Sequence, residues 1–247
     1  MISHIFSFQG NRKQNEDCVV FKSSTYSKII RCSEFSEMVE TGGEDFLAAV
    51  IDGMGGHPGG DVAAKAVADA LDRLNFINGN LDLDDLLQNI QNHLNTIAAT
   101  RPELKFMGAT VILVVKSENT LKYAWAGDCR LYHRQTNKKW QLLTRDHNVG
   151  NAPENSGRNL EMRTSRQLTR ALMPREQLSA ASEIAEYSTI GLAGSDMIFL
   201  SSDGVWECLP EYLPPELPFE QIIEQTLRAI QLCAEPDNYS GILVKIT

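Results

Sequence analysis

The chain has 247 residues, 43% of them hydrophobic, and its 23 basic and 32 acidic side chains give a net charge of −9. This length suits one large domain spanning residues 1–247, and the acidic balance argues against nucleic acid as a partner. No apolar run approaches membrane-spanning length, and residues 1–6 show neither the basic nor the apolar segment of a signal peptide. We therefore expect no membrane association and a cytoplasmic protein, with a monomer as the default state.

The cysteines are odd in number and show no close paired spacing. They are Cys18, Cys32, Cys129, Cys208 and Cys233. This pattern favours reduced thiols over a disulfide framework or a zinc site. Cys18 and Cys129 each lie beside an acidic residue, so oxidation there could disturb a site, but small buried thiols are the simpler interpretation.

In the N-terminal half, residues 2–9 predict the edge of a sheet, and the polar residues 22–44 predict a strand end and a loop. Residues 46–51 form a short apolar run that predicts a buried strand. A helix is expected from Asp61, which would cap it, to Asn78-Gly79.

Further along the chain, leucines and isoleucines at helical spacing predict a second helix from Leu83 to Ile97. Apolar runs predict strands at 110–115, 121–126, 130–133, 197–200 and 242–246, and a helix at 219–233. Residues 149–167 lack apolar periodicity and predict a loop, and the proline-rich residues 209–218 an irregular connection. Strand runs broken by helices without regular alternation indicate an α+β fold.

Acidic residues recur where these strands end. They are Glu16 and Asp17, Asp52, Asp128, Asp203 and Asp237. Each is interpretable alone as turn chemistry. Acids at five separate strand ends are better explained by one carboxylate-rich site, because gathered negative charges need cations to neutralise them. Carboxylate, carbonyl and water oxygens are the ligands that Mg²⁺ and Mn²⁺ prefer.

The order of motifs resembles the metal-dependent serine/threonine protein phosphatases (the protein phosphatase 2C, or PPM, family), in its bacterial branch. The matching segments are GNRKQNED at 10–17, DGMGGH at 52–57, GAT at 108–110, AGDCRLY at 126–132, LTRDHN at 143–148, LTRAL at 168–172, SSDGVWE at 201–207 and DNYSGILVKI at 237–246. The resemblance covers almost the whole chain. It implies a four-layer α-β-β-α sandwich of two antiparallel sheets flanked by helices, with a flap-like loop at about 149–167.

The resemblance also implies the parts of the site and two or three Mn²⁺ or Mg²⁺ ions. Asp52 would bridge two metals about 3.5–4 Å apart, and a water shared by them would attack phosphorus directly. The remaining implied roles are Asp203 and Asp237 on one metal, the Gly53 carbonyl and Glu16 (through water) on the other, Asp17 in support, Asp128 on a third and weaker metal, and Arg12 on the substrate phosphate. Arg12 suits that role because its planar fork binds phosphate through two hydrogen bonds.

The implied substrates are phosphorylated serine and threonine proteins, with a cognate kinase or its substrates as partners. Met54 occupies the position where eukaryotic relatives carry a histidine proposed to protonate the leaving group, so a metal-bound water would replace that donor. His57 is a second candidate donor, although turn structure explains it better, and His147 is interpreted as structural. Four arginines in and after the flap-like loop are interpreted as solvated charges: Arg158, Arg163, Arg166 and Arg170.

Two alternatives remain from the sequence. One is a catalytically weak phosphoprotein-binding module with a phosphatase fold, against which the presence of Arg12, Asp52, Asp203 and Asp237 argues. The other is a metal-dependent hydrolase of small phosphates or nucleotides, although the chain has no Walker-type phosphate loop.

Overall fold

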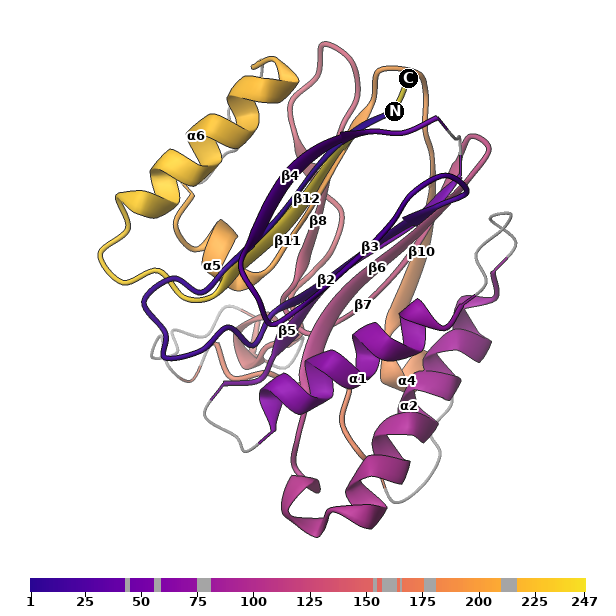
Figure 1. Ribbon diagram of the computed structural model, residues 1–247, viewed down its shortest axis with the longest axis vertical. Helices are drawn as coiled ribbons and strands as arrows, with labels where there is room; N and C mark the ends of the chain where they lie inside the picture. Colours follow the sequence, from indigo (N-terminus) through magenta and orange to yellow (C-terminus); the bar gives the residue numbers. More distant parts are fainter. Residues whose placement is uncertain are drawn as a thin grey trace.

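The computed structural model describes residues 1–42, 45–55, 59–74, 81–152, 155–156, 164, 166–175, 181–209 and 217–247. Two six-stranded antiparallel sheets face each other, and helices cover their outer faces (Figure 1). This is the α+β sandwich that the resemblance implied. Within the described residues, no helix combines the length and apolarity that crossing a bilayer requires.

The first sheet, here called the β1 sheet, has the order β4-β1-β12-β11-β8-β9. Its strands are β1 (Ile2–Phe8), β4 (Phe35–Glu40), β8 (Arg130–Arg134), β9 (Gln141–Leu142), β11 (Met197–Ser201) and β12 (Tyr239–Lys245). The second, the β5 sheet, has the order β10-β7-β6-β5-β2-β3. Its strands are β2 (Cys18–Ser23), β3 (Ser27–Arg31), β5 (Phe46–Gly53), β6 (Ala109–Ser117), β7 (Thr120–Ala126) and β10 (Glu186–Gly191).

The helices lie outside the sheets (Figure 1). They are α1 (Gly60–Asp72), α2 (Leu83–Thr100), α4 (Ala181–Ile184), α5 (Asp203–Trp206) and α6 (Phe219–Gln231), with short 3-10 turns at Pro102–Leu104 and Val149–Asn151. Helices α1 and α2 pack on the β5 sheet through Leu71, Leu87 and Ile90, which are all fully or almost fully buried. Helix α6 packs on the β1 sheet through Phe219 and Ile222.

The central core lies between the two sheets. Phe21 and Val50 of the β5 sheet meet Leu200 and Val244 of the β1 sheet there, with no exposed surface on any of the four. The strands of this layer are apolar on both faces because one face meets the other sheet and the opposite face meets helices. This double burial explains why 46–51 and 110–115 appear in the sequence as continuous apolar runs.

Two expectations about the strands are wrong. Residues 2–9 form an interior strand, because β4 pairs with the outer side of β1. The segment 22–44 contains β3 and β4, whose exposed edge positions carry polar side chains that hide the strand pattern. The β10 strand, Glu186–Gly191, was also not anticipated, for the same reason.

Helix α1 also differs from its prediction. Its N-cap is Gly59 rather than Asp61, and Asp61 in the first turn pairs instead with Lys65 at 3.0 Å. The helix ends at Asp72, well before Asn78-Gly79, and those two residues lie outside the described residues. Helix α2 follows its prediction, and the side chain of Asp82 caps it by accepting hydrogen bonds from the amides of Asp84 and Asp85.

Candidate active site

Strand ends from both sheets meet around one cavity of about 900 Å³. In the β1 sheet, the register pairs Phe8 with Tyr239 and Ser201 with Gly241, so the end of β1, the start of β12 and the end of β11 share one edge. The cavity is lined by residues far apart in sequence: Arg12, Lys13, Gln14, Glu16, Asp52, Gly53, Met54, Gly55, Thr110, Asp128, Gln167, Leu168, Asp203, Asp237 and Asn238. All the residues predicted to hold metal or phosphate are among them.

The four aspartates reach the cavity from four different connections. Asp52 is the second-last residue of β5, where it pairs with Thr110 of β6. Asp203 begins α5 directly after β11, and Asp237 lies two residues before β12. Asp128 lies in the turn that leads from β7 in one sheet to β8 in the other. These four aspartates are far apart in the sequence, but the folded sandwich brings them to one cavity.

Two glycines allow the backbone segments that carry this site to approach closely. Gly10 has a φ of +62°, and a Cβ there would lie 2.1 Å from the carbonyl oxygen of Asp237. A Cβ on Gly204 would lie 2.1 Å from the carbonyl oxygen of Asn238. Only glycine fits both positions, so the loop of Arg12, the start of α5 and the Asp237 segment are packed backbone against backbone.

The carboxylates strongly disfavour one another's ionised form. Burial, followed by the charges of Asp203 and Asp17, holds the pKa of Asp52 well above its usual range. Burial, followed by the charges of Asp128 and Asp237, does the same to the pKa of Asp203. Burial also raises the pKa of Asp17 and of Asp128 to about 6. A cluster of this kind favours cations or protons as partners.

Asp17 lies at the inner wall of the cluster and is fully buried. Its Oδ2 accepts a hydrogen bond from the hydroxyl of Ser202 at 2.9 Å, whereas its Oδ1 has no hydrogen-bond partner among the described residues. Ser202 is the residue before Asp203, so this bond fixes the start of α5 to the Asp17 segment.

Asn238 fastens the loop that carries Arg12 and Glu16. Its Oδ1 accepts from the amide of Glu16 at 2.9 Å, and its Nδ2 donates to the carbonyls of Gln9 and Gln14 at 2.7 and 3.0 Å. Asn238 lies inside one of the matching motifs, but no role was predicted for it. Its signal was its position directly after a candidate ligand.

A second support holds the Asp128 turn. The indole Nε1 of Trp206 donates to the carbonyl of Asp128 at 3.0 Å. The guanidinium of Arg130 lies 3.5 Å from the centre of the Trp206 ring and donates to both carboxylate oxygens of Asp146, at 2.9 and 2.8 Å. Because Trp206 belongs to the helix that Asp203 begins, this stack ties the positions of Asp203 and Asp128 together.

Arg12 pairs with Asp237 in this structure, and its side chain is 55% exposed. Arg12, which is predicted to bind the substrate phosphate, thus forms an ion pair with Asp237, which is predicted to bind metal. Within the described residues, no three carboxylate, histidine or cysteine side chains are close enough to form a ready-made cage for one ion. The donor set still fits hard divalent cations, because it consists of mutually repelling carboxylates, and the unpartnered oxygen of Asp17 lies among them.

The structure describes only parts of the flap-like loop predicted at about 149–167. Residues 149–151 form a 3-10 turn, and Asn148 pairs with Leu168. Residues 153–154, 157–163 and 165, which include Arg158 and Arg163, lie outside the described residues, as does His57. His147 is structural as interpreted, since its Nδ1 accepts from the amide of Gly127 at 3.1 Å.

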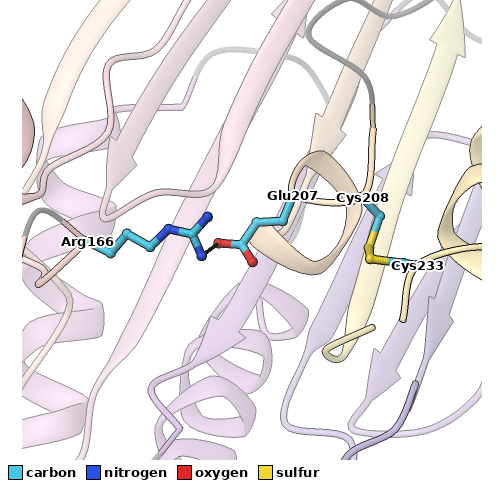
Figure 2. The surroundings of a disulfide bond; sticks show 4 residues. All are labelled: Arg166, Glu207, Cys208 and Cys233. Carbon is cyan, nitrogen blue, oxygen red and sulfur yellow. Dashed lines mark ion pairs between the residues drawn. A yellow bond between two sulfur atoms is a disulfide. The ribbon is translucent and has the colours of Figure 1, made fainter. Parts of the chain in front are cut away.

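Two arginines interpreted as solvated charges have acidic partners. Arg170 lies 3.7 Å from Glu186, and Arg166 pairs with Glu207 at 2.6 Å. Figure 2 shows Arg166 reaching Glu207, which follows α5 and precedes Cys208. The flap-like segment is thereby linked to the helix that begins with Asp203.

The cysteine prediction is wrong in part. Cys208 and Cys233 form a disulfide that joins the end of α5 to the end of α6, with their Cα atoms 5.6 Å apart (Figure 2). The 25-residue separation gave no sign of it, because only the packing of α6 beside α5 brings the two sulfurs together. Cys18, Cys32 and Cys129 are free, and Cys18 and Cys129 are buried as interpreted.

A two-sheet sandwich with a carboxylate-lined cavity at one edge, and an arginine at its rim, has the parts of a metal-dependent phosphate-ester hydrolase. The family model described as protein phosphatase 2C matches residues 24–238. A serine/threonine phosphatase (stp) of Listeria innocua is 27% identical over 180 residues, which cover 67% of this chain and 68% of that protein.

Solved structures share the fold. The serine/threonine phosphatase Stp1 of Staphylococcus aureus superposes with a TM-score of 0.78 at 22% identity, covering 99% of this chain and 94% of that one. The catalytic domain of the serine/threonine protein phosphatase PstP, solved with two manganese ions, gives 0.71 at 22% identity with both chains fully covered. The chain belongs to the protein phosphatase 2C family and is a metal-dependent protein serine/threonine phosphatase.

Proposed function

We propose that the cavity hydrolyses phosphoserine and phosphothreonine esters of proteins with the help of two divalent cations, Mn²⁺ or Mg²⁺. The observation that carries the proposal is the meeting of Asp52, Asp203 and Asp237 with Arg12 around one cavity. Side chains of this kind, spread from residue 12 to residue 237, have little reason to line one cavity unless they bind shared ligands.

We assign the residues of the cavity to the following roles. Asp52, central in the cluster, would bridge both ions. Asp203 and Asp237 would complete one site. The carbonyl of Gly53 and a water held by Glu16 would complete the other. A third and weaker site would use Asp128 together with Asp203, on the two segments that Trp206 connects. When bound, the two ions supply charge neutralisation and an activated water at neutral pH.

Side chains of the protein bind the phosphate and hold the loop that carries Arg12. Arg12 binds the phosphoryl oxygens and neutralises the charge that develops on them. To do so, its guanidinium would exchange Asp237 for the substrate, which would leave the Asp237 carboxylate available to hold a cation. Asn238 keeps the Arg12 loop in place during this exchange, through its bonds to the backbone of Gln9, Gln14 and Glu16.

The direct test is phosphate release from a phosphothreonine peptide. We expect release that requires Mn²⁺ or Mg²⁺ and stops when a chelator is added. A phosphoprotein-binding module would bind the peptide without releasing phosphate. If ATP were cleaved far faster than the peptide, the proposed substrate class would be wrong.

We propose further that the substrates are phosphorylated proteins of a kinase pathway, including a cognate kinase or its targets, and that a monomer in the cytoplasm acts on them. Residues 1–247 would act as one phosphatase domain. Size-exclusion chromatography with light scattering tests the monomer, and a dimer at micromolar concentration would contradict it.

A further inference from the structure

Two free cysteines lie in contact behind the carboxylate cluster, outside the proposed chemistry. The Sγ atoms of Cys18 and Cys32 are 3.5 Å apart. Cys18 begins β2, directly after Asp17, and Cys32 directly follows β3, the strand paired with β2 (Figure 1). Cys18 is fully buried, whereas Cys32 is partly exposed. Of the two residues, Cys32 is therefore the one nearer to solvent.

We propose that Cys18 and Cys32 are a reversible oxidation site that forms an intramolecular disulfide when the protein meets a hydroperoxide. The Cys32 sulfur attacks the O–O bond of hydrogen peroxide, which breaks; an S–O bond forms and water leaves, giving a sulfenic acid. The Cys18 sulfur then attacks the Cys32 sulfur. The S–S bond forms, the S–O bond breaks, and the hydroxyl leaves as water with the thiol proton.

The disulfide requires only a small movement. The two sulfurs must approach from 3.5 Å to about 2.05 Å, and the partly exposed segment of Cys32 is the side free to move. Cys18 is held in the core between its strand neighbours, where it pairs with Ile51, the residue before Asp52. The movement therefore falls on Cys32 and Ser33.

This segment contacts the residues on either side of Glu16. The amide of Cys32 donates to the carbonyl of Asp17 at 2.9 Å, and the carbonyl of Ser33 accepts from Nδ2 of Asn15 at 3.3 Å. A displacement of Cys32 is thus passed to the backbone that positions Glu16 and Asp17. Oxidation should weaken the binding of a cation at the Glu16 side of the cavity, a consequence that rests on the proposed function.

Thiol counting tests the covalent step without using activity. Purified protein is treated with hydrogen peroxide, unfolded without reductant, alkylated and analysed by intact mass and peptide mapping. We expect three alkylatable thiols before treatment and one, Cys129, after it, with a peptide linking Cys18 to Cys32. In the Cys32→Ser variant the Cys18 thiol should stay alkylatable, and the Cys18→Ala variant should carry oxygen on Cys32 without a link.

Three results would overturn the proposed site. The first is that the thiols of Cys18 and Cys32 both remain free after treatment. The second is a sulfinic acid on Cys32 beside a free Cys18, and the third is a disulfide from either residue to Cys208 or Cys233. Reduction of the treated protein should restore the thiols of Cys18 and Cys32, and peptide mapping separates them from any thiols released at Cys208 and Cys233.

Calorimetric titration with Mn²⁺ tests the consequence for the site. We expect the oxidised protein to bind Mn²⁺ about tenfold more weakly than the reduced protein, as is typical when the surroundings of a ligand shift. The Cys32→Ser variant should bind equally well before and after peroxide. Equal affinity in the linked and reduced proteins would refute the connection to the site, whereas absence of Mn²⁺ binding in both would refute the proposed function and leave the disulfide result standing.

Discussion

Replacing Asp52 by asparagine should stabilise the metal-free protein and abolish its phosphatase activity. Burial and the charges of Asp203 and Asp17 hold the pKa of Asp52 well above its usual range, so its ionised form is unfavourable in the folded state. In the same cluster, the pKa of Asp17 is raised from 3.8 to about 6. At about 1.4 kcal/mol per pKa unit, the shift of the Asp17 pKa alone opposes folding at neutral pH by roughly 3 kcal/mol.

The asparagine keeps the shape of Asp52 and removes its charge. The metal-free variant should therefore be more stable than the wild type, and for a chain of this size each 1 kcal/mol gained raises the melting temperature by about 2–4 °C. Phosphate release from a phosphothreonine peptide with Mn²⁺ should fall at least about 100-fold, since losing a direct ligand costs more than losing a supporting residue. Added Mn²⁺ should also stabilise the variant less than the wild type.

Thermal unfolding with a chelator and with Mn²⁺ measures the first and third effects, and a phosphate-release assay measures the second. Glu224→Gln is the matched control, because Glu224 is an exposed acid on α6 and its loss should change none of the three. Wild-type turnover in Asp52→Asn would refute the metal assignment. A lower melting temperature of the metal-free variant would refute the account of carboxylate repulsion.

Three other changes, in the side chain of Arg12, in pH and in the Cys208–Cys233 bridge, should alter activity or stability. Arg12→Lys keeps the charge but loses the planar fork, so kcat/KM for a phosphopeptide should fall about 10- to 100-fold, and an unchanged value would remove Arg12 from the phosphate site. The folded pKa values of Asp17 and Asp128, about 6, exceed the unfolded value of 3.8, so their stabilising contribution is full below pH 3.8 and is lost as pH rises to about 6. Melting temperatures of the chelated protein across that window should fall, and a rise across it would contradict these shifts. Cys208→Ser opens a bridge across 25 residues and should cost about 3 kcal/mol of stability, and a reductant should lower the melting temperature of the wild type but not of this variant.

The acids that the sequence singled out line one cavity because they follow apolar strands whose ends meet there. A run such as 46–51 that is buried on both faces is easily recognised, and an aspartate at its end must lie where the core meets water. The prediction of a loop in segment 22–44 was wrong for the opposite reason. Its strands β3 and β4 lie at sheet edges, where exposed polar side chains remove the apolar signal.

Contacts between segments that are distant in the chain could not be predicted from the sequence. The Cys208–Cys233 disulfide depends on how α6 packs, and the role of Asn238 depends on the loop of Gln14 and Glu16 lying beside it. The need for glycine at position 204 appears only when the backbone of Asn238 is seen 2.1 Å from where a Cβ would be. Such requirements belong to the assembled sandwich rather than to any local pattern.

A crystal structure of the protein grown with Mn²⁺, with diffraction measured at the manganese absorption edge, would show whether the carboxylates of the cavity hold two ions together. We expect two anomalous peaks in the cavity, both within bonding distance of Asp52, one of them also bonded to Asp203 and Asp237. Arg12 should then have left Asp237 and face the space above the ions. A cavity without manganese, or peaks bonded only to residues elsewhere, would contradict it.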